Sequence, residues 1–308
     1  MDPAQTGPHQ PIRSVRGNRD RGSGLKRSVL IAGCGYVGSA AANLFLERGW
    51  EVTGWTRSSE PPPQQPVGRV EHRVVDLRQS EEVRRNASAF EVVIHCASSS
   101  GGRPQHYQRL YGDGVRNLLD AFPRARLIFT SSTGVYQQTD GGWVDEESPS
   151  RPAPPKSRIL LGAEEAVLGR EGIVLRLGAI YGPGRSFHLQ RVRSGTAAIS
   201  PVDRYVNQIH RDDAAAALVF LAEHPQLGWP RLFNVVDNEP SLRNDVLHWL
   251  AAQLGRKLLL SSEAPPSKRG DSNKRVNNAR LRALGWSPRY PSYREGFLQS
   301  VLPAANLL

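Results

Sequence analysis

Three glycines near the start of the chain have the spacing of a phosphate-binding loop. A run of apolar residues leads into Gly33-x-Gly35-x-x-Gly38, and an alanine-rich helical pattern follows. Gly33 permits a tight turn, Gly35 lets a diphosphate approach the backbone, and Gly38 lets the helix pack closely on the strand. The free N–H groups of Tyr36 and Val37 would face the phosphates. The loop predicts binding of a dinucleotide, NAD(P); the alternative is a tight strand-to-helix turn without a ligand.

The residues after the second predicted strand bear on which dinucleotide is bound. An acid there would accept hydrogen bonds from a free ribose 2′-OH, but the chain has Arg57 and Ser58 instead. A guanidinium and a hydroxyl suit a 2′-phosphate. We therefore expect NADP(H) to be favoured over NAD(H), with a solvated Arg57 as the alternative.

Four residues after later strands complete the predicted cofactor site. Asp76 could accept a hydrogen bond from the adenine amino group while Leu77 packs on the ring, although a plain surface acid fits Asp76 nearly as well. Ala97 and Ser131 end the fourth and fifth predicted strands. We expect these small residues to leave room for the cofactor.

The glycine loop must be held by alternating strands and helices. Apolar runs rich in valine, isoleucine and leucine alternate with helical patterns, which is typical of βαβ units and a parallel sheet buried on both faces. The predicted strands are Ser28–Ala32, Glu51–Trp55, Glu71–Val75, Val92–Cys96, Leu127–Ser131, Ile173–Leu177 and Leu232–Val236. The predicted helices are Gly38–Arg48, Gly112–Phe122, Ser157–Gly169, Asp212–Glu223 and Ser241–Leu254, the last with Ser241 as its N-cap.

The pattern predicts an α/β fold, a Rossmann-type doubly wound parallel sheet with a smaller C-terminal substrate lobe. Residues 1–25 are polar and basic and are expected to be a disordered tail. Residues 26–183 form the predicted NAD(P)-binding domain. Residues 184–308 form most of the substrate lobe, and residues 232–238 return to the sheet.

With these motifs in order, the chain resembles the extended short-chain dehydrogenase/reductase superfamily, also called the NAD-dependent epimerase/dehydratase family. The resemblance covers roughly Lys26–Gly296, with a C-terminal tail like that of an atypical subgroup. Besides the glycine loop it depends on Phe129-Thr-Ser-Ser-Thr-Gly-Val-Tyr136, Arg176-Leu-Gly-Ala-Ile-Tyr-Gly-Pro-Gly-Arg185 and Asn207-Gln-Ile-His-Arg-Asp-Asp213.

The resemblance implies a serine or threonine after the fifth strand and a Tyr-x-x-x-Lys pair on the next helix. Ser132 matches the first of these, but Lys156 stands where the tyrosine belongs and Leu160 where the lysine belongs. Hydride transfer to a carbonyl needs a proton source. Tyr136, Tyr181 and Lys156 are the replacements we consider, against packing roles for the tyrosines and a solvated lysine.

The resemblance also places Tyr181, Arg185 and His210 near the substrate. Arg185 could hold an anionic group through two hydrogen bonds or make a structural salt bridge. His210, followed by two acids, could instead order the start of a helix. The expected function is that of an NAD(P)-dependent oxidoreductase or epimerase-like enzyme acting on a small polar metabolite. The alternative is a non-catalytic redox sensor or regulatory protein.

Composition limits the remaining classes. The net charge of +11 leaves a nucleic-acid partner open, but we recognise no nucleic-acid motif and expect a solvated basic surface. No apolar run is long enough to span a membrane. Two cysteines fit a reducing, cytoplasmic compartment, and no cysteine or histidine spacing predicts a metal site. A homodimer remains open.

Overall fold

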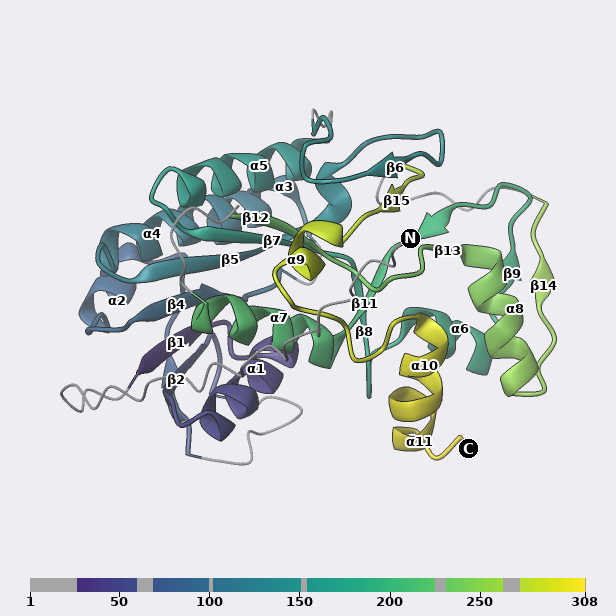
Figure 1. Cartoon of the computed structure of the whole chain (residues 1–308), viewed down its shortest axis with the longest axis horizontal. Coiled ribbons are helices and arrows are strands. Elements are labelled where there is room, and N and C mark those ends of the chain that lie inside the picture. The colour runs from purple at the N-terminus through teal and green to yellow at the C-terminus, as the bar shows by residue number, and fades with distance from the viewer. Residues whose placement is uncertain are drawn as a thin grey trace, which may run out of the picture.

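The structure, a computed structural model, describes residues 27–59, 69–99, 102–150, 154–224, 231–262 and 272–307. Its centre is a parallel sheet in the order β12-β7-β5-β4-β1-β2-β3 (Figure 1). The strands are β1 (Ser28–Ala32), β2 (Glu51–Thr56), β3 (Glu71–Val74), β4 (Val92–His95), β5 (Arg126–Ser132), β7 (Ile173–Leu177) and β12 (Leu232–Val235). This is the predicted Rossmann-type sheet.

The strand order reverses beside β1, which fixes where a ligand can bind. Ala32, the last residue of β1, lies opposite Trp55 of β2 and His95 of β4. In open parallel sheets, ligands bind outside the carboxyl ends of the strands at such a switch point. The glycine loop follows Ala32 directly and therefore lies at this position.

Helices cover both faces of the sheet, so its inner strands are buried as their apolar sequences predict (Figure 1). The edge strand β3 is the exception, because three of its four residues are exposed. On one face α1 (Tyr36–Glu47) and α7 (Arg211–Glu223) pack against each other and share one hydrophobic cluster. On the other face α4 (Gly114–Ala121) and α5 (Pro155–Leu168) share a second cluster. The helix α2 (Ser80–Arg85) and the turns α3 (Pro104–Tyr107) and η1 (Gln108–Asp113) flank them.

A smaller lobe, on the right of Figure 1, is built mostly from later residues. Its helices include α6 (Phe187–Arg193), α8 (Arg243–Gln253), α10 (Tyr293–Gly296) and α11 (Leu302–Ala304), and α9 (Ala279–Ala283) lies between the lobe and the sheet. Four separate two-stranded pairs lie outside the central sheet, and the β9–β14 pair is at the outer edge of the smaller lobe (Figure 1). The pairs are β8 (Ala179–Tyr181) with β11 (Gln208–His210), β10 (Tyr205–Val206) with β13 (Ser241–Leu242), β9 (Ala198–Ile199) with β14 (Leu259–Leu260), and β6 (Trp143–Val144) with β15 (Arg275–Val276).

All seven predicted strands are present, with bounds that differ by at most one residue at either end. The five longer helices are present too, but the predicted cap Ser241 is wrong. Ser241 belongs to β13 and donates a hydrogen bond to the carbonyl of Glu239, so Leu242 precedes α8 instead. The predicted tail, residues 1–25, lies outside the described residues.

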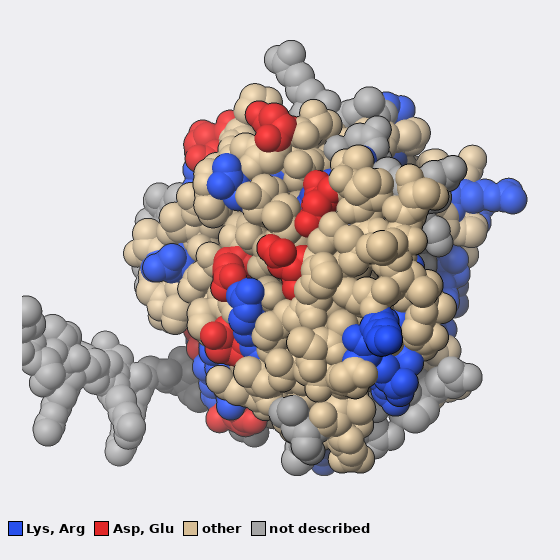
Figure 2. All heavy atoms as spheres, turned by 90° about the vertical axis from the view of Figure 1, so that its right-hand side faces the viewer, with Lys and Arg blue, Asp and Glu red and all other residues tan. Residues whose placement is uncertain are grey.

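Charges of both signs share the surface of the smaller lobe. Figure 2 shows separate groups of basic and acidic side chains on this face rather than one continuous basic area. Within the described residues, no helix is both long and apolar enough to cross a membrane.

Candidate functional site

The first and third glycines of the loop are held by close backbone contacts. Gly33 has a φ of +105°, and a Cβ on it would lie 2.2 Å from the backbone nitrogen of Ala97. A Cβ on Gly38 would lie 2.4 Å from the carbonyl oxygen of Gly33. Any side chain at either position would push β1, β4 and α1 apart.

Gly35 is different, because a Cβ there would meet no atom within 4 Å. It is the residue before α1, whose first turn receives no side-chain cap. The uncapped N–H groups of Tyr36 and Val37 thus start a helix beside open space. This arrangement fits a dinucleotide, whose diphosphate would occupy the space and accept from the helix N-terminus.

The four residues predicted to bind the adenosine end have different surroundings in the structure. Arg57 and Ser58 are exposed after β2, as a 2′-phosphate site requires. Asp76 pairs with Arg78 through both carboxylate oxygens, the closest contact being 2.5 Å. The hydrogen bond from Arg78 lowers the pKa of Asp76, and the charge of Arg57 acts in the same direction. The carboxylate of Asp76 is therefore already paired with Arg78 and is not a free acceptor for the adenine amino group. Leu77, which was expected to pack on the adenine ring, is buried in the core.

The two serines that end β5 have separate environments. Ser131 is buried and donates a 2.5 Å hydrogen bond to Glu164 on α5, so its hydroxyl is directed into the protein. Ser132 accepts from the backbone N–H of Gly134 at 3.1 Å and begins a short turn. Of the two, only Ser132 retains its hydroxyl proton for an external acceptor.

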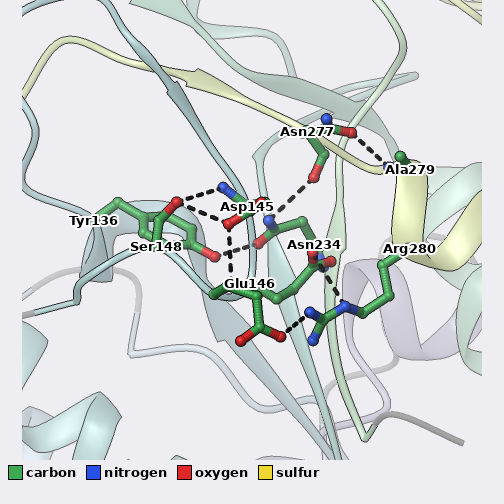
Figure 3. A network of polar contacts seen from close by, with 9 residues as sticks. Tyr136, Asp145, Glu146, Ser148, Asn234, Asn277, Ala279 and Arg280 are labelled. Carbon is green, nitrogen blue, oxygen red and sulfur yellow. Dashed lines mark hydrogen bonds and ion pairs between the residues drawn. The ribbon is translucent and has the colours of Figure 1, made fainter.

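Tyr136 is fully buried. Its hydroxyl donates to Asn234 Oδ1 at 2.9 Å (Figure 3). The guanidinium of Arg176 lies over its ring, and burial raises its pKa. Asn234 is held in turn by Glu146, which accepts from its backbone N–H, and by the carbonyl of Asn277. Tyr136 thus belongs to a buried network that connects β12 to the loops carrying Glu146 and Asn277. A hydroxyl held in this way is not available to donate a proton to a substrate.

Lys156 lies near the start of α5, at the place of the tyrosine in the resemblance. It is half-buried, and its Nζ lies 5.0 Å from the ring centre of Tyr107. The next residue, Ser157, donates to the carbonyl of Gly134 at 3.1 Å, so this end of α5 adjoins the turn after Ser132. Leu160 is buried in the core.

The three predicted substrate residues do not lie together on the surface. Arg185 is exposed, whereas Tyr181 and His210 are buried under the C-terminal residues. His210 packs 4.2 Å from the ring of Tyr290 and contacts Ser300 through Nε2.

His210 is the residue before α7, and its Nδ1 accepts from the backbone N–H of Asp212. Burial lowers its pKa to about 4, so the ring is neutral at pH 7. This placement agrees with the second interpretation of His210, in which it orders the start of a helix.

Several residues of the site were missed by the sequence analysis. Glu164 and Arg176 form a buried ion pair at 2.6 Å, and Arg211 lies against Tyr36. Only Arg176 gave a signal, since it interrupts an apolar strand.

The two cysteines are not ready nucleophiles. Burial raises the thiol pKa of Cys34 to about 11 and of Cys96 to about 12. Among the described residues, no three histidine, cysteine or acidic side chains converge as metal ligands would.

Comparison with known proteins decides the family. A sequence profile described as the NAD dependent epimerase/dehydratase family matches residues 29–235. The chain belongs to this family. A solved structure from Methylobacillus flagellatus, described as a putative NAD-dependent epimerase/dehydratase, is 31% identical over 91% of this chain and 99% of that one, with a TM-score of 0.76.

Two curated relatives match over nearly their whole length. Protein YeeZ of Escherichia coli is 28% identical over 86% of this chain and 97% of its own. A 3-diazoavenalumate denitrifying reductase from Streptomyces is 28% identical over 87% of this chain and 98% of its own. The fold is also that of a Thermus thermophilus UDP-glucose 4-epimerase solved with NAD, with a TM-score of 0.76 at 24% identity. Family membership establishes an NAD(P)-dependent oxidoreductase or epimerase-like type of protein.

Proposed function

We propose that this chain is an NADP(H)-dependent oxidoreductase or epimerase-like enzyme that acts on a small polar metabolite. The observation that carries the proposal is the open space at Gly35, at the uncapped N-terminus of α1, between two glycines whose backbones are in close contact with their neighbours. Space at the middle glycine lets a diphosphate approach the backbone at the start of α1.

The preference for NADP(H) depends on Arg57. Replacing Arg57 with glutamine is expected to weaken NADPH binding about tenfold, because a charge-assisted contact to the 2′-phosphate is lost. NADH, which lacks that phosphate, should bind equally to both proteins. Fluorescence titration with each nucleotide measures this.

Arg73→Gln is the matched control, because Arg73 is an arginine on the neighbouring β3, paired with Glu71 at 2.6 Å. It should leave both affinities unchanged. Tighter binding of NADH than of NADPH by the unaltered protein would contradict the preference.

Catalysis needs a group that supplies a proton to the substrate oxygen. A bound reduced nicotinamide would provide the hydride. We assign the proton to the ammonium of Lys156, which stands at the tyrosine position beside the turn that follows Ser132. Ser132, whose hydroxyl proton is available, would orient the substrate oxygen.

Lys156→Met is expected to lower turnover about 100-fold, in the range of a lost general acid, while NADPH affinity stays within twofold of the original. Lys156→Arg should not restore activity, because a guanidinium keeps the charge but does not release its proton. The assay is NADPH oxidation with a panel of aldehydes, keto acids, nucleotide sugars and an aryl diazonium ion. The last is included because the Streptomyces relative is named a denitrifying reductase. An acceptor that loses dinitrogen on taking up hydride needs no proton, so its turnover should be unaffected by Lys156→Met.

A non-catalytic redox sensor is the second candidate. It is favoured by the burial of Leu160 at the lysine position and of the Tyr136 hydroxyl in the core. Tight NADPH binding by a protein that turns over nothing in the panel would favour the sensor over the enzyme.

A further inference from the structure

Two arginines converge on the tyrosine that follows Gly35. The guanidinium carbons of Arg185 and Arg211 lie 5.3 Å and 5.2 Å from the ring centre of Tyr36. The Tyr36 hydroxyl donates to the carbonyl of Pro183 at 2.9 Å, which ties the ring to the turn that carries Arg185. Both cations therefore lie beside the glycine loop.

A tight turn from Gly182 to Arg185 holds Arg185 beside the ring of Tyr36. Gly182 and Arg185 exchange two backbone hydrogen bonds of 3.0 Å, with Gly184 at a φ of +72° between them. A Cβ on Gly182 would lie 2.6 Å from the Tyr36 hydroxyl oxygen, so the turn could not approach the ring with another residue there. Arg211 follows β11, which pairs with β8 just before this turn.

The positive charge at this place is not balanced within the described residues. Arg211 donates from Nε to Asp212 at 2.7 Å, but its buried Nη1 has no hydrogen-bond partner among them. Arg185 is exposed and has no acidic partner in the described part of the chain. Among the described residues, Asp212 is thus the one carboxylate that pairs with either guanidinium, and it pairs with Arg211 alone.

The neighbouring groups do not supply the missing negative charge. Burial raises the pKa of Tyr36 to about 12, so the phenol is neutral. The uncapped N-terminus of α1, a helix of 12 residues, adds positive potential of its own. A buried guanidinium nitrogen without a partner is unfavourable, and a ligand oxygen would satisfy it.

We propose that Arg185 and Arg211 form a binding site for an oxyanion, a carboxylate or a phosphate, on the smaller-lobe side of the glycine loop. The planar donor fork of arginine matches both groups. This inference deepens the proposed function, since the oxyanion belongs either to the dinucleotide diphosphate or to an acidic substrate bound next to it. In the second case the metabolite is an anion.

The test compares Arg185→Gln with the original protein in two titrations. The first uses NADPH, and the second uses inorganic pyrophosphate added to protein saturated with NADP⁺. Loss of one charge-assisted contact should weaken binding about tenfold in one of them. A weaker NADPH affinity identifies the cofactor diphosphate, and a weaker pyrophosphate affinity alone identifies a separate substrate site. Arg185→Lys keeps the charge but not the planar pair of donors, so its affinity should lie between those of the original protein and Arg185→Gln.

Arg116→Gln is the matched control, an exposed arginine on α4, which packs against the other face of the sheet. If Arg185→Gln equals this control in both titrations, the oxyanion site is refuted. If the original protein binds no dinucleotide, the proposed function fails, yet a tenfold loss of pyrophosphate binding in Arg185→Gln, then measured without NADP⁺, would still support the site. Thermal melting of each variant confirms that a loss of binding is not a loss of folding.

Discussion

Replacing Gly35 with leucine is expected to abolish dinucleotide binding while the protein keeps its melting temperature within a few degrees. A Cβ on Gly35 would meet no protein atom within 4 Å, and the backbone, with φ −97° and ψ −138°, lies outside the left-handed region but also outside the two regions that L-residues favour, so the melting temperature should fall by only a few degrees and by less than in Gly33→Ala. The leucine side chain would instead fill the space that the diphosphate needs. We expect NADPH affinity to fall at least about 100-fold, since the phosphates would lose both contact and access.

Two substitutions show whether this result is specific. Gly162→Leu, on the exposed side of α5, also adds a side chain where no atom lies within 4 Å. It should leave binding unchanged and raise the melting temperature by at most a few degrees, because leucine favours a helix interior over glycine. Gly33→Ala should instead lower the melting temperature, because its Cβ collides with the backbone of Ala97. Retention of full NADPH affinity by folded Gly35→Leu would remove the basis of the cofactor site.

The sheet and the glycine loop were predictable because their signals are local. A strand buried on both faces must be apolar along its length, and a phosphate loop needs glycine at fixed spacing. The residues Ser28–Ala32 show this well, since the predicted and observed strand are the same and its last four residues are apolar and buried. Short elements such as α2 carry no such signal, because one helical turn buries only Val83.

The chemistry of the site was less predictable because it depends on contacts between distant residues. Tyr136 could be a proton donor by sequence position, but its partner Asn234 lies 98 residues away. Tyr181 and His210 could line a cleft, but Tyr290 and Phe297 from the C-terminal part of the chain pack on them. No pattern near these residues shows what will cover them.

Replacing Arg176 with methionine is expected to destabilise the protein by about 3–5 kcal/mol, the usual result of removing one partner from a buried ion pair. The guanidinium holds Glu164 through three contacts of 2.6–3.2 Å, and both side chains are at most 4% exposed. Without it, the hydroxyl of Ser131 would be the remaining donor to the carboxylate among the described residues. Urea denaturation measures the change in the free energy of unfolding.

The double variant Glu164→Gln, Arg176→Met separates an unpaired charge from lost packing. A neutral glutamine oxygen can still accept from Ser131. The double variant should therefore lose clearly less free energy of unfolding than the sum of the losses in the two single variants. Arg84→Met is the control, because its ion pair with Glu81 is more than half exposed and should contribute about 0.5 kcal/mol or less.

This network joins α5 to β5 and β7, and α5 carries Lys156 at its first turn. If Arg176→Met were no more destabilising than Arg84→Met, the buried pair would not fix α5 against the sheet. The position of the proposed proton donor would then need another explanation.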